Sequence, residues 1–443
     1  MTIGVDALPR PVQAALAWGS LSTLAAGAAS ALGQWALLVI LARFGSPELV
    51  GRYALALAVA APVMALGGLQ LRTLITTDAR GRFPLARCLQ LRWASTALSV
   101  ALVALAGRAA GDFAATAWLA VLKAIEQFAD LYHGLWLRQE RPAHLAAAWW
   151  SKTILGLGAF AAVLGLTSSL PAALALLAAA HLTVLALYER RAAAGLLNLA
   201  EYSDGCDVAH ALLRAAPRLV SAPAGARDKG RDEPRPGRLK PAPRRWRPLL
   251  GAALPLGLLL GAVTFLAAVP RYFVAHRFGP AALGRFAALA QLPLILHVAL
   301  GSVGQAATAR LAADFCFAPV SFFRLSRDLI RLAVLAGTLA LAALPLLDSL
   351  AGWLYGPAYA GHYALLGWAT AAAAASGVAG MIGTALTAAG ILVPQLACYG
   401  LAIVLCLTLC GAGVFPPAAL AVASVALTAG QSVLLRRFRL RRA

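Results

Sequence analysis

Long apolar stretches with few or no charged residues follow one another along most of the chain, and this feature limits its possible folds more than any other. A helix needs about 20 mostly apolar residues to cross the hydrocarbon of a bilayer. Hydrophobic residues make up 61% of the chain and charged residues only 12%, which is outside the range of soluble domains. The sequence predicts twelve membrane spans, over residues 14–42, 49–77, 86–107, 112–137, 143–167, 170–189, 248–275, 282–309, 325–347, 360–386, 391–412 and 416–435.

The expected fold class is an all-α, polytopic membrane protein. Because an unpaired backbone amide is costly in lipid, each span should be a helix. The strands of a transmembrane barrel would instead give short segments of alternating hydrophobicity.

The distribution of basic residues predicts the orientation of the chain. The formal net charge of +21 would suggest a nucleic-acid partner in a soluble protein. With the N-terminus placed inside, however, 28 of the 38 Lys and Arg fall on the cytoplasmic side, 5 on the outer side and 5 inside spans. This asymmetry follows the positive-inside rule. We therefore expect both termini in the cytoplasm, contacts between basic residues and membrane lipids, and no nucleic-acid partner.

One segment does not resemble a membrane span. Between residues 190 and 247 the chain is rich in Pro, Gly and charge, with thirteen Lys or Arg against six Asp or Glu, so it cannot build a core. The sequence predicts a cytoplasmic linker there, between a six-helix lobe at 1–189 and a second six-helix lobe at 248–443 with a basic tail.

A repeated phrase indicates how the two lobes are related. The segment RFGSPELVGRYALALAVAAP (43–62) is nearly repeated as RFGPAALGRFAALAQLP (277–293). Both copies read as outer hairpins, because Gly ends one helix and Pro suits the first turn of the next. Since both are predicted on the same side of the membrane, the lobes are expected to be parallel repeats, an architecture of transporters with the cargo site between the halves.

Charged residues inside the predicted spans mark the candidate binding site, because each is costly in lipid and usually faces a cavity or a partner. The basic ones are Arg72, Arg92, Lys123, Lys152 and Arg271, and the acidic ones are Glu126 and Asp130. The span at 112–137 places Lys123, Glu126, Asp130 and His133 within an arc of roughly 80°. The surplus of positive charge suits an anionic cargo such as a pyrophosphate. An alternative is that Lys123 only neutralises a carboxylate and so holds helices together.

Four stretches give the chain a family resemblance. They are LLVILARFGSPELVGRYALA, KAIEQFADLYHGLWLRQERP, ALPLGLLLGAVTFLAAVPRYFVAHRFGPAALGRFAALA and GQAATARLAADF. They resemble the bacterial oligosaccharide flippases of lipopolysaccharide, O-antigen and capsule assembly, within the multidrug/oligosaccharidyl-lipid/polysaccharide exporter superfamily. The resemblance implies a V-shaped, MATE-like pair of lobes around a central cavity. The positions that match the family are Lys123, Glu126, Asp130, Gly134, Pro270, Arg271, Tyr272 and Phe273. Where relatives tend to carry polar residues before PRYF, this chain has FLAAV, which puts sugar binding by the second lobe in doubt.

The predicted function is that of a flippase, which moves undecaprenyl-pyrophosphate-linked oligosaccharide across the bacterial cytoplasmic membrane by alternating access. The five basic residues would attract the cargo, while Glu126 and Asp130 are candidates for coupling to protons or sodium. Polysaccharide polymerase and ligase are further partners that this function implies, and no cofactor is expected. The alternative is a cation- or proton-coupled antiporter of small molecules from the same superfamily. No catalytic motif or metal-ligand cluster is visible in the sequence, so neither enzymatic activity nor a metal site is expected.

Overall fold

A computed structural model describes residues 10–77, 83, 85–109, 111–139, 141–193 and 246–442 of the chain. Its regular elements in these residues are all helical. The first lobe contains α1 (Arg10–Phe44), α2 (Pro47–Gly68), α3 (Leu71–Thr77), α4 (Leu85–Ala109), α5 (Phe113–Arg138), α6 (Pro142–Thr167), α7 (Leu170–Val184) and the π-helical turn η2 (Leu185–Glu189). The second lobe contains α10 (Arg247–Phe317), α11 (Pro319–Ala342), α12 (Leu344–Tyr355), the 3-10 turn η4 (Pro357–Tyr359), α13 (Tyr363–Ala388), α14 (Leu392–Gly411) and α15 (Pro416–Arg442).

These helices correspond to the twelve predicted spans, and the all-α, polytopic fold class is confirmed. Within the described residues, nine helices are long and apolar enough to cross a membrane, and the bent pair α11 and α12 makes a tenth. The helix α10 contains two spans, because its backbone leaves the helical conformation at Gly279 (φ 79°, ψ 176°). The remaining span is α5, which is less apolar because it carries the charged residues of the candidate site.

Two predicted spans need correction. The span at 49–77 is not one helix, since Leu69 and Gln70 both have a φ of 49° and separate α2 from α3. Left-handed residues other than glycine are uncommon and end a helix. The span at 325–347 begins earlier, at Pro319, and breaks at Ala343, where the chain bends by 67° into α12. Most of the predicted linker lies outside the described residues.

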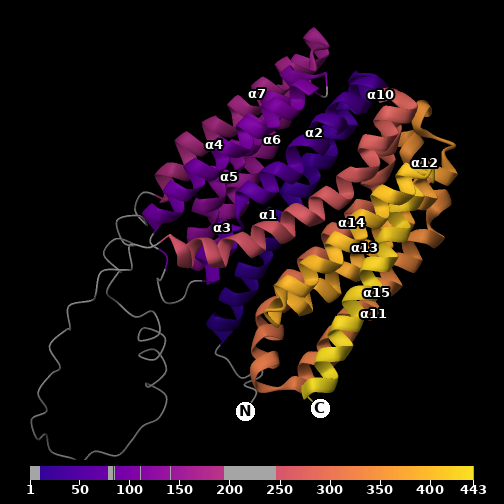
Figure 1. The fold of residues 1–443 in the computed structure, drawn as a ribbon. Coiled ribbons are helices and arrows are strands. Elements are labelled where there is room, and N and C mark those ends of the chain that lie inside the picture. Colours follow the sequence, from indigo (N-terminus) through magenta and orange to yellow (C-terminus); the bar gives the residue numbers. More distant parts are fainter. Residues whose placement is uncertain are drawn as a thin grey trace, which may run out of the picture.

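The two lobes form separate groups of helices that lie side by side, with α10 packed along α2 (Figure 1). The start of α1 and the end of α15 lie at the same end of the molecule, which we refer to as the inner end (Figure 1). The two copies of the repeated phrase lie at the opposite, outer end. Their predicted turns are present, since Ser46 caps α2 by accepting a hydrogen bond from the Leu49 amide at 3.3 Å.

The two copies of the repeated phrase pack directly against each other. A Cβ atom on Gly51 would lie 1.9 Å from the carbonyl oxygen of Pro280, and a Cβ atom on Gly284 would lie 1.8 Å from that of Pro47. The first turn of the helix from the other lobe therefore packs directly on each glycine, and the two contacts are nearly symmetric. Only residues without a side chain allow this approach of two helix backbones.

A second contact between the lobes joins α1 to α12 at the same end. The indole of Trp35 donates to the hydroxyl of Tyr355 at 3.0 Å. The guanidinium of Arg43 donates from Nε to the carbonyl oxygen of Leu354 at 2.7 Å, and from Nη2 to that of Trp353. The lobes are thus held together at the outer end by helix packing and by hydrogen bonds.

Candidate functional site

The charged residues of α5 form ion pairs rather than a free cationic surface. The ammonium of Lys123 lies 2.7 Å from Glu126 Oε2 on the same helix. Asp130 lies 3.5 Å from Arg72 Nη1, which comes from α3. The break at Leu69 and Gln70 starts α3 beside α5, and this placement brings the guanidinium to the carboxylate.

A second group of ionisable residues lies closer to the inner end and is completely buried. Glu189 Oε1 lies 2.8 Å from Lys152 Nζ and 2.8 Å from His133 Nε2. The side chains of Glu189, Lys152 and His133 are 0%, 1% and 1% exposed. His133 also lies next to Asp130, with 3.6 Å between Nδ1 and Oδ1, so the two groups of ionisable residues are continuous.

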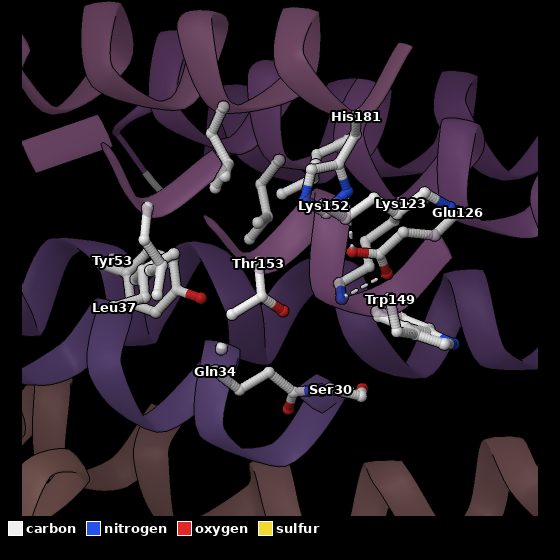
Figure 2. A pocket seen from close by; sticks show the side chains of 15 residues that line it. Ser30, Gln34, Leu37, Tyr53, Lys123, Glu126, Trp149, Lys152, Thr153 and His181 are labelled. Atoms are coloured by element: carbon white, nitrogen blue, oxygen red, sulfur yellow. Dashed lines mark hydrogen bonds and ion pairs between the residues drawn. The ribbon is translucent and has the colours of Figure 1, made fainter. Parts of the chain in front are cut away.

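A small pocket lies within the first lobe, between α1, α2, α5, α6 and α7. Its cavity volume is about 50 Å³, and its polar lining includes Gln34, Tyr53, Lys123, Glu126, Lys152 and His181. Figure 2 shows these side chains pointing toward one another around the pocket. Pockets that take drug-sized molecules measure about 300–1,000 Å³, whereas one water needs little more than about 10 Å³. The pocket therefore suits water or a small ion and is too small for a sugar.

Arg92 and Arg271 are held differently from the other basic residues. Arg92 is 1% exposed and contacts the amide oxygen of Gln127 at 3.3 Å rather than a carboxylate. Arg271, on α10, is partly exposed, and the groups within its electrostatic reach are the phenols of Tyr53 and Tyr272. The hydroxyl of Tyr272 donates to the carbonyl oxygen of Ala58 at 2.5 Å, so this part of α10 lies against α2.

The predicted site residues are therefore only partly brought together. Lys123, Glu126 and Lys152 line one pocket. Asp130 and Arg72 form an adjoining pair, Arg92 lies apart inside the first lobe, and Arg271 lies between the lobes. The binding role of these residues stays a prediction. Among the described residues, no group of three or more His, Cys, Asp or Glu could hold a metal ion.

Glu189 was not among the site residues predicted from the sequence. Only Glu126 and Asp130 were counted as acidic residues inside the spans, although Glu189 ends the predicted span at 170–189; in the structure this helix continues to Ala193 and Glu189 is fully buried. With Glu189 added, the candidate residues are five basic and three acidic, so the positive surplus is smaller than expected. The sequence does contain a signal for this residue, because the carboxylate of Glu189 stands at the end of an apolar run and no turn residue follows directly.

Comparisons with known proteins agree with this architecture. No protein-family model and no curated protein matches the chain by sequence. By structure, the chain is similar to a point mutant of the Vibrio cholerae MATE transporter VcmN, with a TM-score of 0.62 and 11% identity over 97% of each chain. The chain has the MATE transporter fold.

Two further solved structures support the same fold. An inward-facing multidrug resistance MATE family transporter of the MOP superfamily gives a TM-score of 0.56 and 14% identity over 96% of this chain and 95% of its own. A MATE structure in the bent conformation gives 0.59 and 13% identity over 100% of this chain and 98% of its own. The expectation of two MATE-like lobes of six helices is thus confirmed.

Proposed function

We propose that the protein is a secondary membrane transporter that works by alternating access between its two lobes. The observation that carries this proposal is the chain of buried ionisable residues inside the first lobe of a MATE fold. Intramembrane charges are costly and usually serve ion or substrate pathways. The contact of Gly51 with Pro280 and its symmetric counterpart close the outer end, so alternating access would consist of parting the lobes there.

Coupling to protons or sodium is assigned to the carboxylates of α5. Glu126 lines the pocket, and its ion pair with Lys123 keeps the pocket close to neutral. A proton or a sodium ion at Glu126 or Asp130 would change that charge, and a change of charge in a low-dielectric site can bias a conformational equilibrium. The volume of the pocket suits such an ion.

For the cargo, one proposal is an anionic lipid-linked oligosaccharide, as the family resemblance implies. Arg271 supports this proposal, because it lies between the lobes near phenols rather than beside a carboxylate. Its guanidinium would be available to a pyrophosphate. In this case the protein would work in the bacterial cytoplasmic membrane, with both termini in the cytoplasm, and its partners would include membrane lipids and the polysaccharide polymerase and ligase.

The second candidate is a cation- or proton-coupled antiporter of small molecules, and the comparisons support it at least as well. One of the structurally similar proteins is a multidrug resistance transporter. The ion pairs of Arg72, Lys123 and Lys152 also neutralise three of the five basic residues that favoured an anionic cargo.

Disruption of the gene separates the two candidates. A flippase predicts that undecaprenyl-pyrophosphate-linked oligosaccharide accumulates on the cytoplasmic leaflet, with drug susceptibility unchanged. An antiporter predicts increased susceptibility to exported compounds and no accumulation of lipid-linked oligosaccharide. Complementation with the wild-type chain should restore either phenotype, and R271Q should fail to restore it only for the flippase. If none of these quantities changes, both proposals are wrong.

A further inference from the structure

Glu189 is a carboxylate that neither cargo proposal uses. It ends the π-helical turn η2, within the last membrane-crossing helix of the first lobe, and it is 0% exposed. One oxygen contacts Lys152 and His133, while Oε2 has no hydrogen-bond partner. A buried polar atom without a partner is uncommon and calls for a specific reason. Single π-helical turns are also frequent at functional sites.

Asp130 and His133 form a route to Glu189 from the exposed side of α5. Asp130 is 37% exposed and lies 3.6 Å from His133 Nδ1, while His133 Nε2 lies 2.8 Å from Glu189. His133 Nδ1 has no hydrogen-bond partner. The neutral imidazole that donates from Nε2 to Glu189 has a free lone pair on Nδ1, facing Asp130. Nδ1 of His133 can therefore accept a proton that is delivered through Asp130, while Nε2 releases its own proton to Glu189.

Lys152 connects this site to the pocket. Its ammonium lies 2.8 Å from Glu189, and its side chain also lines the pocket together with Glu126. If Glu189 takes up a proton, Lys152 loses its ionised partner, and a buried ammonium without one is costly. The carboxylate across the pocket is then its nearest alternative, because Glu126 already lies within electrostatic reach of Lys152.

We propose that Glu189 is a proton-binding site, filled through Asp130 and His133, and that its protonation transfers Lys152 from Glu189 to Glu126. This inference rests on the proposed transporter function, since it supplies the means by which proton uptake changes the pocket. The net step moves one proton from solution to the carboxylate of Glu189. The only covalent bonds that break or form are the O–H and N–H bonds of the transferred protons.

The other ionisable groups around η2 are consistent with Glu189 as the proton-binding site. The helices that pack against η2 are α5, α6 and α7. Besides the residues already named, His144 of α6 contacts the hydroxyl of Tyr188 at 3.1 Å, and His181 of α7 lies 3.8 Å from Glu126. The described residues of η2 and these helices place no further carboxylate in contact with Lys152.

Infrared difference spectroscopy of the purified full-length protein tests the proposal without knowledge of the cargo. Lowering the pH should produce the carbonyl band of a protonated, buried carboxyl group. E189Q should abolish this band, whereas E48Q, which removes a carboxylate at the outer end, should leave it unchanged. K152Q should move the appearance of the band to higher pH because it removes the stabilising cation, and E126Q should move it to lower pH because Lys152 then has only Glu189.

Three results would overturn the proposal. The band could be absent from the wild-type protein at every pH at which it stays folded, in which case Glu189 is a permanently ionised structural partner. The band could survive in E189Q and vanish in E126Q, which would place the proton at Glu126. E126Q could also leave the pH dependence unchanged, which would show that Lys152 does not exchange partners. If E189Q does not fold, the double variant E189Q/K152Q, which leaves no unpaired buried charge, should lack the band instead. Transport assays remain a separate measurement, so a transporter without the proton site stays distinguishable from a protein that transports nothing.

Discussion

Replacing Gly51 with alanine should open the outer end of the molecule. The added Cβ would lie 1.9 Å from the carbonyl oxygen of Pro280, whereas real Cβ contacts almost never fall below 3.0 Å. The helix α2 and the second half of α10 would have to separate by about 1 Å, and overpacking of this kind costs about 1–3 kcal/mol. This free-energy cost applies only to the closed conformation, in which α2 and α10 touch at Gly51. About 2 kcal/mol changes the ratio of closed to open molecules by roughly 30-fold.

The accessibility of a cysteine at position 54 measures this change. Ala54 is 2% exposed and packs with Leu283 and Phe286 at the contact between α2 and α10. In a chain without its six native cysteines, A54C should react slowly with a maleimide that does not cross membranes. Adding G51A should increase the rate at least about tenfold, if the shift in the equilibrium is as large as estimated.

Two further variants make the experiment decisive. G251A changes a glycine of α10 whose added Cβ would have no atom within 4 Å, so the labelling rate should stay the same. G284A introduces the symmetric clash with Pro47 and should act like G51A. Unchanged labelling in both G51A and G284A would refute the conclusion that these glycines close the outer end.

Two other substitutions test the ion pairs and the second contact between the lobes. K123Q leaves Glu126 in the lobe without its partner at 2.7 Å, so the free energy of unfolding should fall by about 2 kcal/mol; K123Q/E126Q should recover most of that loss in thermal unfolding experiments. An equal loss in the single and double variants would mean that the loss does not come from the unpaired carboxylate of Glu126. W35F removes the hydrogen bond to Tyr355 at 3.0 Å, worth about 1 kcal/mol, and should increase A54C labelling roughly fivefold. A rate equal to that of A54C alone would exclude this bond from the outer closure.

The spans could be predicted from the sequence because membrane insertion depends on local hydropathy. Even α5 was predicted, although its three central charges make it the least typical span. The repeat of RFG followed by Pro was equally informative, since both turns occur where the phrase predicts them. The break at Leu69 and Gln70 was not foreseeable, because neither residue favours a left-handed conformation.

The candidate site was only partly predictable. A helical wheel placed Lys123 and Glu126 on one face, and their ion pair follows from a spacing of three residues along α5. Glu189 and Lys152 are far apart in the sequence, and their contact depends on how α6 packs against η2. No local pattern contains this information.

The sequence by itself determined that the chain is a bundle of membrane helices in two related halves, because hydropathy and turn residues act within a few residues of one another. Only the tertiary structure decided what the repeated phrase and the buried charges do. Gly51 and Gly284 became the contact between the lobes because each meets the backbone of the other helix. Lys152 acquired a partner because three helices converge at Glu189. Both results depend on distances between helices, and these distances are set by the packing of the whole bundle.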